Sequence, residues 1–228
     1  MSSRCIIAID GPAGSGKSTV ARELATRLGY AFLDTGAMYR AAAVAVIDAG
    51  IDPNDASACA REVQRHSISL DPGSFPPRVL LDGRDVGARI REPDISAASS
   101  PVSASPPVRE ALVAAQRTFA QEYPFLVTEG RDQGSVVFPD AEVKIFLDAR
   151  AEVRAARRTA ELHSRGLPAE EGEVLRSIVE RDARDSTRAN SPLCEARGAV
   201  RVDSSVITVE QVVARIMALV PAGTAANR

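Results

Sequence analysis

The stretch IDGPAGSGKST, residues 9–19, decides the fold of this chain. It follows an isoleucine-rich run at residues 6–9, and a short apolar run that ends in a glycine turn is typical of a buried parallel strand. After the turn, apolar residues recur at helical spacing over residues 17–28, and Gly29 is well placed to end that helix. The sequence therefore predicts a strand, a glycine-rich loop and a helix in direct succession.

Within this stretch the spacing of the glycines, Lys17 and Ser18 satisfies G-x4-G-K-[ST]. Backbone N–H groups of such a loop turn inward around phosphates, and the N-terminus of the following helix adds its partial positive charge. We expect Lys17 to reach the β- and γ-phosphates of ATP and the Ser18 hydroxyl to bind Mg²⁺. A purely structural glycine turn is the alternative, which the flanking strand and helix disfavour. The loop residues expected to bind ATP are Gly11, Pro12, Ala13, Gly14, Ser15, Gly16, Lys17, Ser18 and Thr19.

Beyond the loop, short apolar runs alternate with segments of helical periodicity. Such alternation predicts an α/β fold in three layers, with a mostly parallel sheet covered by helices on both faces. Ligands of these sheets bind at the carboxyl ends of the strands. Five runs are followed there by polar residues, which are Asp10, Asp34, the cluster at 129–132, Asp148 and Asp203.

Residues 67–107 differ in character, because they hold half of the 14 prolines and many serines. The run RVLLDGRDV, residues 78–86, places an Asp-Gly turn between β-prone runs. We therefore expect a small inserted lobe with a hairpin at 67–107, rather than a disordered loop. The core should comprise residues 1–66 and 108–220, and residues 221–228 should form a frayed tail.

The composition indicates the cellular compartment and argues against some classes of partner. Among the 28 basic residues only Lys17 and Lys144 are lysine, and the formal net charge of −2 argues against nucleic acid as a partner. Three scattered cysteines, Cys5, Cys59 and Cys194, suggest neither a disulfide framework nor a zinc site, and the reduced cytoplasm is the simplest compartment. The early apolar run is shorter than a signal-peptide core, and no segment approaches a membrane span. We expect a soluble monomer without a membrane partner.

Arginines gather in the regions that should surround the loop. The set is Arg40, Arg131, Arg154, Arg157, Arg158, Arg181, Arg184 and Arg188. Their forked side chains suit phosphate recognition, and the set exceeds what one triphosphate requires, so a second anionic ligand is the economical interpretation. Surface solvation of Arg40, helix-surface ion pairs within ERDARDSTR and a turn-capping role of Asp132 are the plainer alternatives. His66 and His163 have no ligand pattern nearby, and we assign them no catalytic role.

The motifs IDGPAGSGKST, LDTGAMYR, VREAL, EGRDQGSVVFPDA, KIFLDA and ERDARDSTRANSPL closely resemble the bacterial cytidylate kinases in order and spacing. The resemblance spans roughly residues 6–220. It implies a P-loop kinase fold whose insert at 67–107 binds the nucleoside monophosphate and whose helical lid lies at about 151–168. It also implies transfer of the γ-phosphoryl group of ATP to CMP or dCMP, with ATP and CMP or dCMP as small-molecule partners and Mg²⁺ as cofactor.

The resemblance also assigns roles to single residues. It gives Arg40, Arg131 and Arg188 to the CMP phosphate, Ser100, Arg109 and Asp132 to cytosine, and Arg181 and Asp185 to the sugar, with Asp34 and Tyr39 also on the CMP side. Arg154 and Arg157 are expected beside ATP in the lid, and the groups expected to act in catalysis are Lys17, Arg131, Arg158 and Arg188. Asp34 or Asp132 could hold Mg²⁺ through water.

Two positions leave the resemblance open. Gln133 stands where the family usually carries an aliphatic residue, and the run Ser99, Ser100, Pro101 makes the base-contacting serine ambiguous by one position. A P-loop kinase for UMP, AMP or another metabolite, and a nucleotide-binding module without catalysis, are the rival functions.

Overall fold

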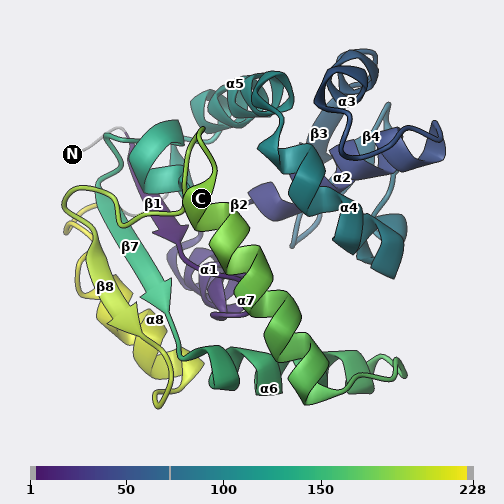
Figure 1. Cartoon of the computed structure of the whole chain (residues 1–228). Coiled ribbons are helices and arrows are strands. Elements are labelled where there is room, and N and C mark those ends of the chain that lie inside the picture. Colours follow the sequence, from purple (N-terminus) through teal and green to yellow (C-terminus); the bar gives the residue numbers. More distant parts are fainter. Residues whose placement is uncertain (1–3, 72, 225–228) are drawn as a thin grey trace. The chain divides into compact units, whose positions relative to one another are not determined.

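The computed structural model describes residues 4–71 and 73–224. Its main sheet has five strands in the order β2-β6-β1-β7-β8, which confirms the predicted five-stranded sheet flanked by helices (Figure 1). The strands are β1 (Cys5–Asp10), β2 (Ala31–Asp34), β6 (Phe125–Gly130), β7 (Val143–Asp148) and β8 (Val200–Asp203). β7 pairs in parallel with β1 on one side and β8 on the other. Every residue of β1 is buried, as the isoleucine run predicted.

By its internal contacts the chain divides into two compact units, Met1–Tyr30 together with Val127–Arg228, and Ala31–Leu126. The predicted boundaries of the insert at 67–107 and of the lid remain predictions. The two units are described separately below.

The first unit carries the glycine-rich loop and four α-helices. These are α1 (Lys17–Leu28), α6 (Ala151–Ser164), α7 (Glu171–Thr187) and α8 (Val209–Met217), and a π-helical turn η2 covers Gln133–Val137. α1 has the predicted bounds. It ends at Gly29, whose φ of 68° allows the N–H of Tyr30 to bond the carbonyl of Ala25. α6 packs against α7, and Gly166 and Pro168 lie in the segment that joins the two helices.

The second unit combines helices with a small antiparallel sheet of order β3-β4-β5. The strands are β3 (Ile68–Asp71), β4 (Arg78–Leu81) and β5 (Arg84–Asp85), and the helices are α2 (Thr35–Asp48), α3 (Ala56–Val63), the short 3-10 helix η1 (Arg89–Arg91), α4 (Pro93–Ala104) and α5 (Pro106–Glu122). Asp82 and Gly83 both have positive φ, which is the two-residue turn that Asp-Gly favours. The predicted hairpin is therefore confirmed, and the disordered alternative is wrong.

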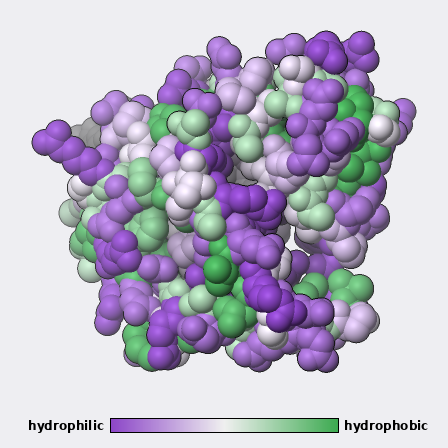
Figure 2. Space-filling view, in the orientation of Figure 1, coloured by the Kyte–Doolittle hydropathy of each residue, from purple (hydrophilic) through white to green (hydrophobic). Residues whose placement is uncertain are grey.

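The surface and the chain's end complete this description. On the face that Figure 2 shows, hydrophilic residues cover most of the surface and hydrophobic ones form smaller areas. None of the helices in the described part of the chain is long and apolar enough to cross a bilayer. Residues 225–228 of the predicted frayed tail lie outside the described residues, whereas Thr224 is buried and its carbonyl accepts a hydrogen bond from the Tyr30 hydroxyl.

Candidate active site

The phosphate loop passes so close to neighbouring elements that two of its positions strongly favour glycine. Gly11 has a φ of 151°, and a Cβ atom there would collide with the carbonyl oxygen of Leu147 in β7. Gly14 has a φ of 75°, and its Cβ would lie 3.2 Å from the Cβ of Arg154. Both positions combine close approach with a backbone conformation that other residues rarely adopt. Contact with β7 and α6 thus fixes the path of the loop.

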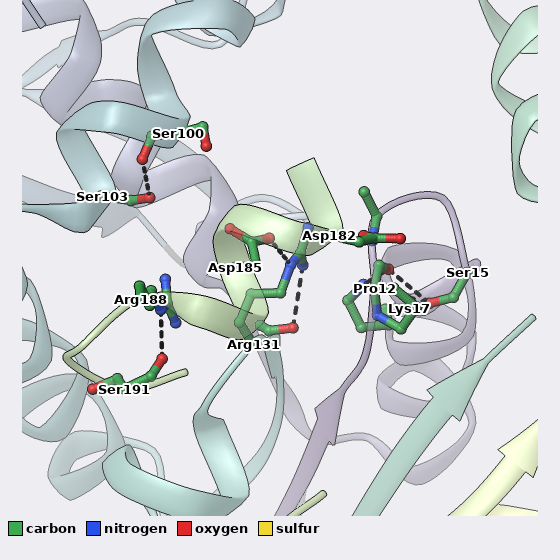
Figure 3. A network of polar contacts seen from close by, with 12 residues as sticks. Pro12, Ser15, Lys17, Ser100, Ser103, Arg131, Asp182, Asp185, Arg188 and Ser191 are labelled. Carbon is green, nitrogen blue, oxygen red and sulfur yellow. Dashed lines mark hydrogen bonds and ion pairs between the residues drawn. The ribbon is translucent and has the colours of Figure 1, made fainter. Parts of the chain in front are cut away.

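Lys17 begins α1 and turns its ammonium group back into the loop. Nζ donates to the Pro12 carbonyl at 2.6 Å and to the Ser15 hydroxyl at 3.4 Å (Figure 3). The residue is only 5% exposed. Burial, followed by the positive charge of Arg131, lowers the pKa of Lys17 to about 7. A negatively charged ligand inside the loop would therefore stabilise the charged form of Lys17 and be stabilised by it.

Ser18 follows Lys17 and faces a carboxylate from a distant part of the sequence. Its hydroxyl donates to Oε1 of Glu129 at 2.7 Å, and Glu129 is buried at the carboxyl end of β6. Sequence reasoning placed Glu129 at this sheet edge but gave it no role. The signal available was its position two residues before the Arg-Asp pair that the resemblance selected.

Asp10, the last residue of β1, anchors the π-helical turn η2. Its two carboxylate oxygens accept the backbone N–H groups of Gln133 at 2.8 Å and Gly134 at 2.7 Å. Burial raises the pKa of Asp10 to about 6, although these two hydrogen bonds oppose the shift. The Gln133 side chain is buried and its Oε1 accepts from the Thr128 hydroxyl at 2.8 Å. At this position the chain thus places a buried polar contact with β6.

Acidic and basic side chains meet where β6 ends and α7 passes. Arg131 donates through Nε to Asp185 at 2.9 Å, and Asp132 beside it is buried. The Arg188 Nε donates to the Ser191 carbonyl at 2.5 Å (Figure 3). Arg181 lies near enough to Lys17 for its positive charge to lower the pKa of that lysine. The first unit thus brings together Lys17, Arg131, Arg181 and Asp185, which come from three separate stretches of the sequence.

The three arginines of α6 have different surroundings. Arg154 is buried and donates to Ala149, to Ala13 and to Asp182. Arg157 donates to the carbonyl of Ser204 at 2.6 Å, and the Ser204 hydroxyl in turn donates to the Ser15 carbonyl at 3.1 Å. Arg158 is partly exposed and pairs with Glu161 at 2.7 Å. Sequence reasoning gave no role to Asp182, which lies within the motif ERDARDSTRANSPL, and missed Ser204, which lies outside the quoted motifs.

The second unit holds the remaining candidate residues. Asp34 caps α2 by accepting the Ala37 N–H at 2.8 Å and pairs with Arg40 at 3.6 Å. The guanidinium of Arg109 lies 5.3 Å from the centre of the Tyr39 ring. In α4, Ser99 and Ser100 are both buried; the Ser99 hydroxyl donates to the Ser96 carbonyl, and the Ser100 carbonyl accepts from the Ser103 hydroxyl.

Within residues 4–71 and 73–224, three or more His, Cys, Asp or Glu side chains nowhere gather in an arrangement that could hold a metal ion. The three cysteines are free, with Cys5 and Cys59 buried and Cys194 exposed.

Comparison with known proteins identifies the family. A sequence model described as cytidylate kinase matches residues 7–222. The cytidylate kinase of Rhodococcus jostii (strain RHA1) is 46% identical over 228 residues, covering 99% of each chain, and that of Rhodococcus opacus (strain B4) is 49% identical over 220 residues, covering 96% of this chain and 95% of the relative. In fold alone, the chain is similar to an uncharacterized protein from Eubacterium ventriosum ATCC 27560, with a TM-score of 0.50 and 13% identity over 94% of this chain and 97% of the other. The chain belongs to the cytidylate kinase family.

Proposed function

We propose that this protein transfers the γ-phosphoryl group of ATP to CMP or dCMP, yielding ADP and CDP or dCDP. The observation that carries this proposal is the phosphate loop whose buried Lys17 faces backbone and hydroxyl oxygens of its own loop. Relatives named cytidylate kinase, matched over nearly the whole chain, support the choice of acceptor.

On the donor side, the residues of the loop from Gly11 to Thr19 bind the triphosphate. The Lys17 ammonium exchanges the Pro12 carbonyl for phosphate oxygens, whose negative charge counteracts the effect of burial and stabilises the charged form. Arg154 and Arg157 border the loop through Ala13 and Ser204, so both belong to the ATP side. The segment at about 151–168 acts as the lid that excludes water.

A divalent cation fits the residues beside Ser18. Mg²⁺ prefers oxygen ligands, keeps several waters and is usually held by one or two protein oxygens plus phosphates. The Ser18 hydroxyl and the Glu129 carboxylate, 2.7 Å apart, are such oxygens, and no larger protein cage is needed. We propose Ser18 as the direct ligand and Glu129 as its partner; when bound, Mg²⁺ neutralises phosphate charge.

On the acceptor side, we propose binding roles for the residues that the family resemblance selects. The phosphate is held by Arg40, Arg131 and Arg188, the cytosine by Ser100, Arg109 and Asp132, and the sugar by Arg181 and Asp185, with Asp34 and Tyr39 supporting these groups. The existing pairs Arg131–Asp185 and Arg40–Asp34 support this proposal, because they hold cationic side chains in place before the ligand arrives. A carboxylate acceptor beside an arginine donor matches the amino group and acceptor atoms of cytosine.

The transfer itself is an in-line displacement. An oxygen of the CMP 5′-phosphate forms a bond to the γ-phosphorus as the bond to the β,γ-bridging oxygen breaks, and ADP leaves with that bridging oxygen. Both reactants already carry oxyanions, so no dedicated general base is required, and catalysis rests on positioning and charge neutralisation. We propose that Lys17, Arg131, Arg158 and Arg188 supply this neutralisation.

An acceptor panel tests the function. ADP release should be measured with ATP and each of CMP, dCMP, UMP, AMP and GMP, with a control that lacks an acceptor. We expect CMP and dCMP to stimulate release most. Stimulation by another acceptor alone would establish the rival kinase, and no stimulation by any acceptor would support a non-catalytic module. Lys17→Met should reduce turnover by orders of magnitude in a folded protein, and unchanged turnover would contradict the role of the loop.

The cellular setting is also a proposal. The three free cysteines are compatible with the reducing cytoplasm. We propose a cytoplasmic monomer, which the concentration dependence of sedimentation would check.

A further inference from the structure

Asp182, in the middle of α7, contacts the phosphate loop directly. Its Oδ1 accepts the backbone N–H of Ala13 at 3.2 Å, and its Oδ2 pairs with Nη1 of Arg154 at 2.6 Å. The same Nη1 donates to the Ala13 carbonyl at 2.9 Å. Asp182 lies beside the loop in Figure 3. One acidic and one basic side chain thus satisfy both polar backbone groups of a single loop residue.

This contact is well shielded from solvent. The side chain of Arg154 is 7% exposed and that of Asp182 19% exposed. Arg154 is further fixed by its Nε, which donates to the Ala149 carbonyl at 2.8 Å, just before α6 begins. Charge-assisted hydrogen bonds in such surroundings are stronger and more restrictive than those on an open surface.

The contact also differs from the ion pairs that are common on helix surfaces. Pairs three or four residues apart on one helix stabilise only that helix, and weakly. Arg154 and Asp182 belong to two different helices, and their shared target is backbone of the loop. Their geometry therefore bears on the loop and not on either helix alone.

We infer that Asp182 is a positioning residue for ATP. Together with Arg154 it forms a clamp that holds the backbone N–H and the carbonyl of Ala13, and it thereby keeps the phosphate loop in the conformation that binds ATP. This inference rests on the proposed function and adds a residue to it. Asp182 acts through the loop and does not touch the nucleotide.

Electrostatic repulsion between the Asp182 carboxylate and the polyphosphate would have the opposite effect on ATP binding. A carboxylate near a polyphosphate repels it, and removing the carboxylate would then tighten binding. Here the charge of Asp182 is neutralised by Arg154 at 2.6 Å, so little repulsion is left to relieve. Loss of a buried charged hydrogen bond, in contrast, costs enough to change an equilibrium constant roughly ten- to hundred-fold. The clamp should therefore dominate, and its loss should weaken ATP binding.

The test compares Asp182→Ala and Asp182→Asn with wild type. Calorimetry would give the affinity for a non-hydrolysable ATP analogue with Mg²⁺ and, separately, for CMP alone. We expect Asp182→Ala to bind the analogue roughly ten- to hundred-fold more weakly and CMP within about twofold of wild type. Asp182→Asn keeps an oxygen that can accept from Ala13, so it should recover part of the loss. Glu180→Gln is the matched control, because it removes an exposed carboxylate from the same helix and should bind both ligands normally.

Several outcomes would overturn the inference. Unchanged or tighter binding of the analogue by Asp182→Ala would show that the clamp does not serve ATP, and equal weakening of both ligands would show a general structural role. If Asp182→Ala fails to fold, Asp182→Asn decides, since wild-type affinity in that variant at lower stability would also contradict the clamp. Arg154→Ala should weaken binding of the analogue at least as much as Asp182→Ala, because it also leaves the Asp182 carboxylate unpaired, and the double variant should lose less than the sum of the two single losses. Failure of the proposed function is separate, because it would appear in wild type as absent transfer to CMP.

Discussion

The lysine of the phosphate loop is a buried cation held ready for an anion. The depressed pKa of Lys17, about 7, arises first from burial and then from Arg131. When polyphosphate oxygens surround the ammonium, the charged form becomes favourable and the pKa rises toward its ordinary value. Binding of ATP and protonation of Lys17 are therefore linked.

This linkage predicts proton uptake. Above pH 7 the free protein carries a partly neutral Lys17 and the complex a charged one, so ATP binding should take up close to one proton at pH 8. Affinity should fall as pH rises above about 7, by up to about tenfold per unit. Calorimetry at pH 8 in two buffers of different ionisation enthalpy measures the uptake. Lys17→Arg is the control, because arginine stays charged; binding by wild type without proton exchange would contradict the linkage.

Gln133 illustrates what a single residue leaves open in sequence. Its identity alone raised the question of whether it packs or reads the base edge. The structure places its side-chain oxygen on Thr128 of β6 and its N–H on Asp10, so it contributes to the buried support of η2. A contact between residues 123 positions apart, as for Gln133 and Asp10, has no local signature.

At the scale of elements, His66 joins a helix to a hairpin. Its Nδ1 lies 2.6 Å from Oδ2 of Asp82 in the β4–β5 turn, and its Nε2 lies 3.2 Å from Oε1 of Glu62 in α3. The hydrogen bond to Asp82, more than that to Glu62, raises the pKa of His66. His66 therefore connects these two elements best when it is charged.

The thermal stability of the protein should depend on the protonation of His66. Because the pKa of His66 is higher in the folded state, its contribution is fully present below the unfolded value of about 6.5 and is lost as pH rises through the folded value. The difference in Tm between wild type and His66→Gln should be larger at pH 5.5 than at pH 8.5. As a control, the same comparison in an Asp82→Asn background, which removes the carboxylate that faces Nδ1, should depend less on pH. A pH-independent difference for His66→Gln would contradict the prediction.

Periodicity in the sequence predicted the core elements but not all of the others. β1 and α1 follow from apolar spacing and glycine punctuation; α1 has the predicted bounds, and β1 extends one residue beyond the predicted run at each end. α4 was not predicted, because serine is a modest helix former and Pro101 lies inside the helix. Its helical state depends on the burial of residues such as Ile95 and Val102, which is a tertiary effect.

The residues of the candidate site were likewise only partly predictable from the sequence. The motif alone revealed Lys17 and Ser18, and family resemblance supplied the arginines. Asp182, Ser204 and Glu129 became visible only through contacts with the loop that span more than 100 residues. Carboxylates and serines are common in every chain, so their types carry no signal without geometry.

At the scale of the whole molecule, α7 contacts residues that we propose for both substrates. Asp182 holds Ala13 of the loop, and Asp185, three residues later on the same helix face, pairs with Arg131. We therefore expect a change in the loop on ATP binding to reach, through this helix, an arginine that we propose for CMP.

This arrangement predicts cooperative binding. A non-hydrolysable ATP analogue should raise the CMP affinity of wild type by at least about fivefold, which is the lower range of allosteric coupling. In Asp182→Ala the factor should fall toward one. Titrating CMP with and without the analogue measures it, and the reverse titration must give the same factor. Full coupling in the variant would show that α7 is not the link.

The scarcity of lysine gives the molecule a built-in spectroscopic probe. Lys17 is buried in the loop, while the other lysine, Lys144, bonds the carbonyls of Pro139 and Arg197 at the surface. Selective isotope enrichment of lysine would yield two side-chain resonances, one from each environment. Nucleotide occupancy of the loop could then be followed in solution by a single signal, without a fluorescent tag or an engineered residue.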